Sequence, residues 1–349
     1  LLHFMNLANG AGRHTFAGAT VILTADIDLN PGWTAGEEAP EQTWTPIADF
    51  QGTFDGQGHT VYGIWAGEVQ ALANSNMEAT TGFFASTKGS VTVKNVTFAN
   101  SYFTASRNAA AVIGLPSAKD ASRTLTFENV IVDAIIESAG AYCGGFIGFY
   151  SQYEWFGSYF NRCASVGTVR ISGTRNTGIF ASGYIGECET PAYFTDCLSA
   201  VDFGESDKPY VTAGFIGHQT HFEAFFVRCI SLVKAQNPTQ YYNASMIGKI
   251  DAKTGNSGSQ KLYFEDCFTE ENQWQENGGN RVSRAVGMYI GTNTATEWMI
   301  EVKYTVRTAG AEKAVDTVYD QKGKQTHAVD KRYYLQKRTM LNAAFSLTM

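Results

Sequence analysis

The chain has 349 residues, of which 44% are hydrophobic and 13% aromatic, and its formal net charge is −7. A chain of this size and composition can bury a substantial core. The negative charge and the lack of a basic stripe argue against nucleic-acid binding. No stretch approaches the roughly 18 consecutive apolar residues of a membrane-spanning helix. The chain begins with Leu1 and shows no signal peptide, so we expect a processed or truncated product.

The first predicted element is a short helix over residues 2–9, which would cap one end of the protein. Further along, Asp55-Gly56 and Gln57-Gly58 supply turn residues before a strand that resumes at Thr60. We interpret the intervening His59 as a turn or stacking residue rather than a catalytic base. An alternative use of this region is a calcium site with oxygen ligands, which would be drawn from Asp26, Asp28, Asp49 and Asp55.

Four short segments in the middle of the chain share one pattern. Each reads aromatic, Phe, any residue, Arg or Asp, Cys, any residue, Ser or Thr, at residues 159–165, 193–199, 225–231 and 263–269. Their cysteines are 34, 32 and 38 residues apart. Residues 93–97 and 127–131 fit the same frame with Asn at the Arg/Asp position and Val at the Cys position. Self-similarity at a period of roughly 20–50 residues is typical of solenoids, propellers and arrays.

A second repeated element alternates with the first. It is a glycine-rich tetrad such as Gly145-Phe146-Ile147-Gly148 and Gly183-Tyr184-Ile185-Gly186. Both elements are short, β-branched and aromatic runs bounded by Gly, Asn, Asp and Ser, which indicates strands. Propeller blades would need hairpin turns in phase with the repeat, and the Asn-Gly and Asp-Gly pairs are sparse. The sequence therefore predicts an all-β fold, a parallel β-helix of about eight coils.

In a parallel β-helix, equivalent residues of neighbouring coils lie about 4.8 Å apart and form ladders. We expect an inner aromatic ladder of Phe127, Phe160, Phe194, Phe226 and Phe264, which Val93 continues. A second, small-residue ladder would contain Val96, Val130, Cys163, Cys197, Cys229 and Cys267. Asparagines and then charges of alternating sign would occupy the corner between the two, and stacked opposite charges attract. These corner residues are Asn95, Asn129, Arg162, Asp196, Arg228 and Asp266.

The six cysteines fit this arrangement without disulfides. Four of them occupy a ladder position that holds Val in other coils, where Cys behaves as a small buried hydrophobe. Bridges between stacked neighbours stay geometrically possible, but we favour free thiols. The state of Cys143 and Cys188, which lie outside the ladder, is open. No Cys-x-x-Cys pair occurs, which argues against a structural zinc site.

The last part of the chain differs from the rest. Residues 292–349 hold nine Lys or Arg and six Asp or Glu, so they carry +3 while residues 1–291 carry −10. The repeat pattern also stops there. We therefore divide the chain into a repeat domain over 1–291 and a C-terminal cap or extension over 292–349, since solenoid ends need covering.

The N-terminal region carries a family resemblance. The succession of residues 16–29, 44–47 and 50–64 resembles the opening of bacterial surface β-helix domains with GLUG-type repeats, and the later glycine-rich tetrads resemble the repeat itself. Such domains occur in surface adhesins and beside the protease part of IgA-cleaving metallopeptidases. The resemblance covers residues 1–291. It implies a right-handed parallel β-helix on a secreted or surface-anchored bacterial protein that acts as a scaffold or adhesin, and it implies no reaction.

An enzymatic function is the alternative to consider. Polysaccharide lyases and hydrolases occur among β-helices, and they need convergent carboxylates, or a base beside an Arg, on one face. The main candidates are Asp202, Glu205 and Asp207. Further ones are Glu187 and Glu189 one coil earlier and His218 and His221 in the next. The His-Glu-x-x-His, Gly-x-Ser-x-Gly and P-loop motifs are absent.

Non-enzymatic binding is the more economical hypothesis. Aromatic side chains gather in three predicted loops, and aromatic residues are enriched in binding surfaces. They are Tyr153, Trp155, Phe156, Tyr241, Tyr242 and Trp274. The expected protein is a secreted or cell-surface adhesion or scaffold module without a cofactor or metal. Its partner would be a glycan, a surface protein or another copy of itself.

Overall fold

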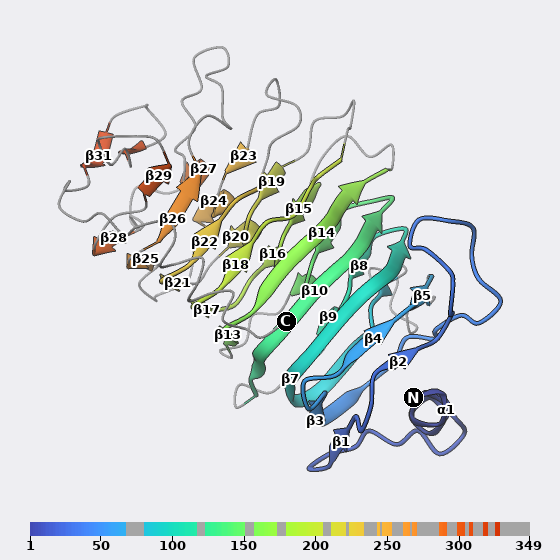
Figure 1. The fold of residues 1–349 in the computed structure, drawn as a ribbon. Helices are drawn as coiled ribbons and strands as arrows, with labels where there is room; N and C mark the ends of the chain where they lie inside the picture. Colours follow the sequence, from blue (N-terminus) through green and yellow to red (C-terminus); the bar gives the residue numbers. More distant parts are fainter. Residues whose placement is uncertain are drawn as a thin grey trace.

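The protein was analysed as a computed structural model, in which the chain folds as a parallel β-helix (Figure 1). The structure describes residues 1–67, 80–116, 123–150, 157–172, 179–204, 211–220, 223–233, 243–244, 246–252, 261–265, 267–270, 286–291, 299–303, 307–309, 317–319 and 325–328. The predicted all-β fold is confirmed, and so is the predicted N-terminal helix, α1 (Leu2–Asn9).

The inner aromatic ladder lies on the first stack of strands. Each strand of this stack pairs in parallel with the equivalent strand of the next coil. The strands are β1 (Thr20–Ile22), β3 (Phe50–Asp55), β7 (Phe84–Ala105), β10 (Leu125–Ser138), β13 (Ser158–Asn161), β17 (Ala192–Thr195), β21 (Ala224–Val227), β25 (Lys261–Glu265) and β28 (Met299–Lys303).

A second stack follows each of these strands around a corner. It too is parallel throughout, and the long strands β7 and β10 belong to both stacks. Its other strands are β2 (Ile27–Asp28), β4 (Thr60–Tyr62), β5 (Trp65–Ala66), β14 (Ala164–Ile171), β18 (Leu198–Ser199), β22 (Ile230–Ser231), β26 (Phe268–Glu270) and β29 (Arg307–Ala309).

Two further stacks close each coil. A six-stranded parallel sheet contains β6 (Thr80–Thr81), β8 (Asn108–Ala110), β11 (Tyr142–Gly144), β15 (Phe180–Ser182), β19 (Val211–Ala213) and β23 (Asn243–Ala244). The other begins with the start of β7 and continues through β9 (Ile113–Pro116), β12 (Ile147–Tyr150), β16 (Ile185–Cys188), β20 (Ile216–Thr220), β24 (Ile247–Ala252) and β27 (Val286–Gly291). An antiparallel pair, β30 (Thr317–Tyr319) and β31 (Gln325–Ala328), stands apart from these stacks.

The structure has about five turns, fewer than the about eight coils that the sequence predicts. Six strands in the six-stranded sheet correspond to five turns of chain between the first strand and the last. The higher count includes incomplete coils at both ends, such as that of β1 and β2, which precedes the first strand of this sheet. Beyond residue 291, β28 and β29 still pair with β25 and β26, and the domain boundary there stays a prediction.

The interior is built from the two predicted ladders and a third one. Neighbouring Phe160 and Phe194 stack with ring centroids 4.7 Å apart and an interplanar angle of 7°. The tetrad aromatics form a parallel column, in which Phe146 and Tyr184 lie 4.6 Å apart. The column meets the Phe ladder edge to face, as Tyr184 does with Phe160 at 88°. Edge-to-face and offset arrangements suit the ring quadrupole, so each coil adds the same well-packed set of rings.

The glycines of the tetrads have a packing reason. A Cβ on Gly145 would lie 2.0 Å from the carbonyl oxygen of Gly183 and 2.3 Å from Oγ of Ser165. A Cβ on Gly183 would meet Ser199 in the same way at 2.1 Å. Because no real Cβ tolerates such distances, the close approach of neighbouring coils requires glycine at these positions.

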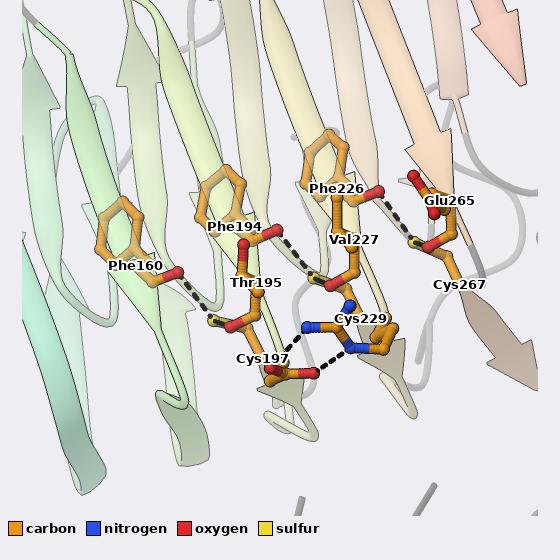
Figure 2. A network of polar contacts seen from close by, with 11 residues as sticks. Phe160, Phe194, Thr195, Cys197, Phe226, Val227, Cys229, Glu265 and Cys267 are labelled. Carbon is orange, nitrogen blue, oxygen red and sulfur yellow. Dashed lines mark hydrogen bonds and ion pairs between the residues drawn. The ribbon is translucent and has the colours of Figure 1, made fainter. Parts of the chain in front are cut away.

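The cysteine ladder is confirmed, and all six cysteines are buried free thiols. Figure 2 shows three of them beside the inner Phe ladder. Each of these three thiols lies within hydrogen-bond reach of two backbone carbonyls, one in the preceding coil and one in its own; Cys197 lies 3.5 Å from that of Phe160 and 3.3 Å from that of Thr195. Burial raises the pKa of Cys163 and of Cys229 well above the ordinary value. These thiols therefore serve as small core residues.

Five of the six predicted corner residues adopt the left-handed conformation. Their φ angles lie between 51° and 55° for Asn95, Asn129, Arg162, Asp196 and Arg228. The Asn129 amide donates to Oδ1 of Asn95 at 2.9 Å, which begins the predicted asparagine ladder. The predicted attraction of opposite charges occurs between Arg228 and Asp196, joined at 2.6 and 2.8 Å. Asp266 lies outside the described residues.

Helix α1 closes the N-terminal end of the solenoid (Figure 1). Its residues Phe4, Met5 and Ala8 are buried, and the Phe4 ring stacks on Phe54 with centroids 6.0 Å apart. Phe54 is in register with Val93 and so belongs to the inner ladder. The helix therefore covers the apolar end of the column, where an open coil would expose core side chains and strand edges.

Candidate functional site

The most distinctive outer feature is a second aromatic ladder on the first stack of strands. Along a strand, side chains alternate between the two faces of the sheet. The residue before each inner Phe therefore points outward, and in four successive coils that residue is aromatic. We call these four residues the outer row: Tyr159, Tyr193, Phe225 and Tyr263, from β13, β17, β21 and β25.

The rings of the outer row stack on one another. The centroids of Tyr159 and Tyr193 are 4.8 Å apart at an interplanar angle of 6°, and those of Tyr193 and Phe225 are 5.1 Å apart at 10°. The Phe225–Tyr263 step is longer, 5.7 Å, and tilted by 40°. Parallel register alone imposes this spacing, so the outer row is a continuous aromatic ridge along the solenoid axis.

Hydrogen bonds fix two members of the row, Tyr193 and Tyr263. The hydroxyl of Tyr193 donates to Oε1 of Glu223 at 2.9 Å. Burial and this hydrogen bond to a carboxylate raise the pKa of Tyr193 above its ordinary value. The hydroxyl of Tyr263 likewise donates to Glu265. Both residues are only half-buried, and their rings are held in place without being removed from the surface.

Tyr159 forms the end of the row and is its most exposed member. Its residue exposure is 40%, whereas Tyr193, Phe225 and Tyr263 are half-buried. In the preceding coil, the residue in register with Tyr159 is Thr126. A threonine is too short to cover a tyrosine ring, so one ring face is left open toward the solvent.

Threonines continue the line of the row toward the N-terminus. Thr126 is in register with Thr92, and Thr92 with Thr53. Beside them, the next outward positions hold Lys94 and Glu128. The ammonium of Lys94 lies 3.3 Å from Oδ2 of Asp55. Hydroxyl and charged groups thus border the open face of the Tyr159 ring.

A second cluster lies on the stack that contains β16 and β20. It brings together two of the residues that the sequence offers as catalytic candidates. Glu187 of β16 and His218 of β20 are in register, with Oε1 and Nδ1 3.3 Å apart. The His218 ring also stacks on Phe180 at 4.5 Å. Both side chains are nearly buried, with relative side-chain exposures of 9% and 7%. This Glu187–His218 pair has the composition of an acid–base dyad but little access to solvent.

Of the three predicted catalytic acids, the structure describes Asp202, which lies away from this pair. Asp202 is exposed and bridges in parallel to Thr168 of β14, on a different side of the coil from β16. Its carboxylate accepts a hydrogen bond from the backbone N–H of Gly204 at 2.8 Å. Glu205, Asp207 and His221 lie outside the described residues.

The predicted binding aromatics also lie outside the described residues, which leaves their role a prediction: Tyr153, Trp155, Phe156, Tyr241, Tyr242 and Trp274. The sequence analysis did not predict the outer row, although its signal was present. The repeat begins with two adjacent aromatics, and strand alternation requires one of them to face outward when the other is buried.

The four N-terminal carboxylates do not come together as a calcium site. Asp26 accepts hydrogen bonds from the backbone of Thr60 and lies 3.1 Å from Nδ1 of His59. These contacts hold the pKa of Asp26 below its ordinary value. Asp49 and Asp55 each face a lysine, at 2.8 and 3.3 Å. In the described part of the chain, no group of three or more His, Cys, Asp or Glu side chains is arranged to hold a metal ion.

A membrane-spanning helix is likewise not found among the residues described: none of their helices is both long and apolar enough.

The comparisons with known proteins show no family for this chain. No known protein-family profile matches the chain, and no curated protein matches it by sequence. Among solved structures, the chain is similar to a crystal structure from Bacteroides ovatus that carries the provisional name immunoglobulin A1 protease. The two share 14% sequence identity over 83% of this chain and 79% of that one, with a TM-score of 0.49. Similarity at this level has no bearing on function.

Proposed function

We propose that the protein is a non-enzymatic adhesion or scaffold module that binds a glycan or protein partner on its outer β-surface. The outer row is the observation that carries the proposal. Core packing does not account for it, because its first ring is 40% exposed. Exposed aromatics are enriched at binding sites, where one ring supplies a large rigid contact at a small entropic cost.

A regular solenoid suits such a role. Stacked coils provide an extended surface on which the same chemical group recurs at each rung. The family resemblance over residues 1–291 further supports a secreted or bacterial surface-anchored protein. Adhesion to a glycan, contact with a surface protein and self-assembly are all compatible with this placement.

The test is to incubate the purified chain with immobilised host and plant polysaccharides and host surface proteins, scoring retention and release of new sugar ends together. Retention without cleavage supports the proposal. A double variant, Tyr159→Ala with Tyr193→Ala, should reduce retention, whereas the control Tyr62→Ala should not. Tyr62 is also half-buried on a strand, but in the second stack. Retention that survives the double variant would contradict a role for the outer row.

The second candidate function is cleavage of a polysaccharide, and the Glu187–His218 pair is the observation that favours it. A carboxylate beside an imidazole is a common acid–base arrangement. Release of sugar ends that disappears in Glu187→Gln and His218→Gln would replace the binding proposal with an enzymatic one. Their low exposure instead suits a structural pair that joins two coils.

A further inference from the structure

The N-terminal end of the outer row, Tyr159, is more exposed than the rest of the row, including the other end at Tyr263. In a face-to-face stack, each inner ring presents both faces to its neighbours. Tyr193 lies between Tyr159 and Phe225, so neither of its faces is available to a ligand. Tyr159 has a ring neighbour on one side only, because Thr126 precedes it. A planar apolar group can therefore stack on Tyr159 without disturbing the row.

The apolar area at this position is small. Among the described residues, the exposed large hydrophobic side chains are Leu7, Ile22 and Tyr159. Leu7 belongs to α1 and Ile22 to β1, both at the N-terminal end. A stable protein–protein interface buries about 800 Å² on each partner around an apolar core. One exposed ring does not supply such an apolar area. A ligand that is one ring wide can be bound by a single exposed ring.

The surroundings of Tyr159 suit a ligand with hydroxyl groups. Thr126 of β10 and Thr92 of β7 extend the line of the row, and Glu128 of β10 and Asn161 of β13 occupy the next outward position. Small-ligand sites combine an apolar contact with a few placed polar groups that fix orientation. A pyranose ring has this character, since one face carries C–H groups and its edge carries hydroxyls.

The charges near Tyr159 do not favour an acidic ligand. Lys94 is paired with Asp55, Glu128 contributes one negative charge, and Arg162, the residue directly after β13, contributes one positive charge. A polyanion would need an excess of Lys or Arg along its path. These groups balance, which is the arrangement expected for a neutral ligand.

We infer that Tyr159 is the platform for one pyranose ring of a neutral polysaccharide, whose chain continues over Thr126 and Thr92 toward the N-terminal end. The inference rests on the proposed binding function and narrows it to one ligand class and one end of the outer row. Glu128 and Asn161 hydrogen-bond the sugar hydroxyls beside the ring. The inner rings act as a support that holds Tyr159 in one orientation.

The experiment is affinity gel electrophoresis of the full chain in gels that contain mannan, laminarin, xyloglucan or, as acidic probes, polygalacturonate and heparin. We expect retardation by a neutral polysaccharide. Tyr159→Ala should raise the dissociation constant about tenfold, which corresponds to the loss of about 1.4 kcal/mol of ring contact. Tyr159→Phe keeps the ring and should bind within about threefold of the parent chain.

Tyr62→Ala is the matched control, because it removes a half-buried ring from a strand of the second stack, away from the outer row. It should leave the affinity unchanged, and circular dichroism will establish that each variant is folded. Binding that is insensitive to Tyr159→Ala, or binding of the acidic probes alone, overturns this inference and leaves the binding function intact. No retardation by any probe overturns the inference, and the proposed function then depends on whether surface proteins are retained.

Discussion

The inner and outer aromatic ladders lie on the same strands and differ in what surrounds them. Ring centroids of Phe160 and Phe194 are 4.7 Å apart, and those of Tyr159 and Tyr193 are 4.8 Å apart. The inner rings are at most 1% exposed, whereas Tyr159 is 40% exposed. Parallel register stacks any ladder of rings, so stacking alone does not distinguish a core from a surface. Burial and edge contacts from the tetrad column make the inner ladder the stabilising one.

The comparison is tested most strongly by removing one ring from each ladder. Phe194→Ala should lower the free energy of unfolding by about 3–5 kcal/mol, because it leaves a cavity in a fully buried stack. Tyr193→Ala, one residue away on the outer face, should cost about 1 kcal/mol or less, as surface changes do. Urea unfolding followed by circular dichroism measures both values.

Equal losses in the free energy of unfolding would contradict the proposed difference between the ladders. They would mean that the outer row contributes as much to stability as the inner ladder does. Phe194→Leu is a useful intermediate. It keeps most of the apolar volume but loses the ring stack and the edge contact with Tyr184, so its cost should lie between the other two.

The cysteine ladder provides a second test of the core, in which the substitution nearly conserves volume. Cys229→Val should cost less than about 1.5 kcal/mol, since Val already occupies the equivalent position at Val96 and Val130 and the change nearly conserves volume. A thiol reagent should find none of the six cysteines in the native protein and all six after unfolding, because every one is buried. Fast labelling of the native chain would contradict the burial.

The solenoid could be predicted from the sequence because its signal repeats. The inner Phe ladder, the Cys/Val ladder and the corner position each follow from one aligned residue type per coil, and the spacing of paired strands does the rest. Arg228 and Asp196 show this well. Their alternation in sign predicts an attraction between coils, and the two side chains form a two-point ion pair.

The candidate site was harder to predict, for two physical reasons. A loop aromatic such as Trp155 has no periodic neighbours, so nothing in the sequence says where its ring lies. Pairs such as Glu187 and His218 meet because two tetrads stack in register, and the residue after each tetrad then falls on one outward row. That register depends on the loop lengths between coils, which vary from repeat to repeat.

At the corner between the inner Phe ladder and the cysteine ladder, a substitution should raise the free energy of unfolding, by a smaller amount than the core substitutions lower it. Arg162 has a φ of 52°, a conformation that costs most residues about 1 kcal/mol or more and that Asn tolerates. Arg162→Asn should therefore raise the free energy of unfolding by about 0.5–1 kcal/mol, measured by urea unfolding. The control Asp196→Asn gains little from the backbone and loses the pair with Arg228, which should cost about 0.2–1 kcal/mol.

The outer surface also carries a pH-dependent contribution at Glu137 on β10. Burial raises the pKa of this carboxyl, but hydrogen bonds from Ser172, Arg170 and Tyr102 outweigh it and hold the pKa below the ordinary 4.5. The Arg170 guanidinium lies 2.6 Å from Oε2. Because the folded pKa is lowered, the stabilisation is present above about pH 4.5 and is lost as the pH falls through the folded value.

Glu137→Gln removes this ionisation, and the free energy of unfolding should then fall less steeply between pH 5 and pH 3 than in the parent chain. The effect should be small, because Arg170 is 42% exposed and water screens such pairs. Asp133→Asn is the matched control, an exposed carboxylate on the same strand, and should leave the slope unchanged. An acid limb that Glu137→Gln leaves unaltered would contradict this prediction, because it would mean that ionisation of the Glu137 carboxyl adds no stability to the folded chain.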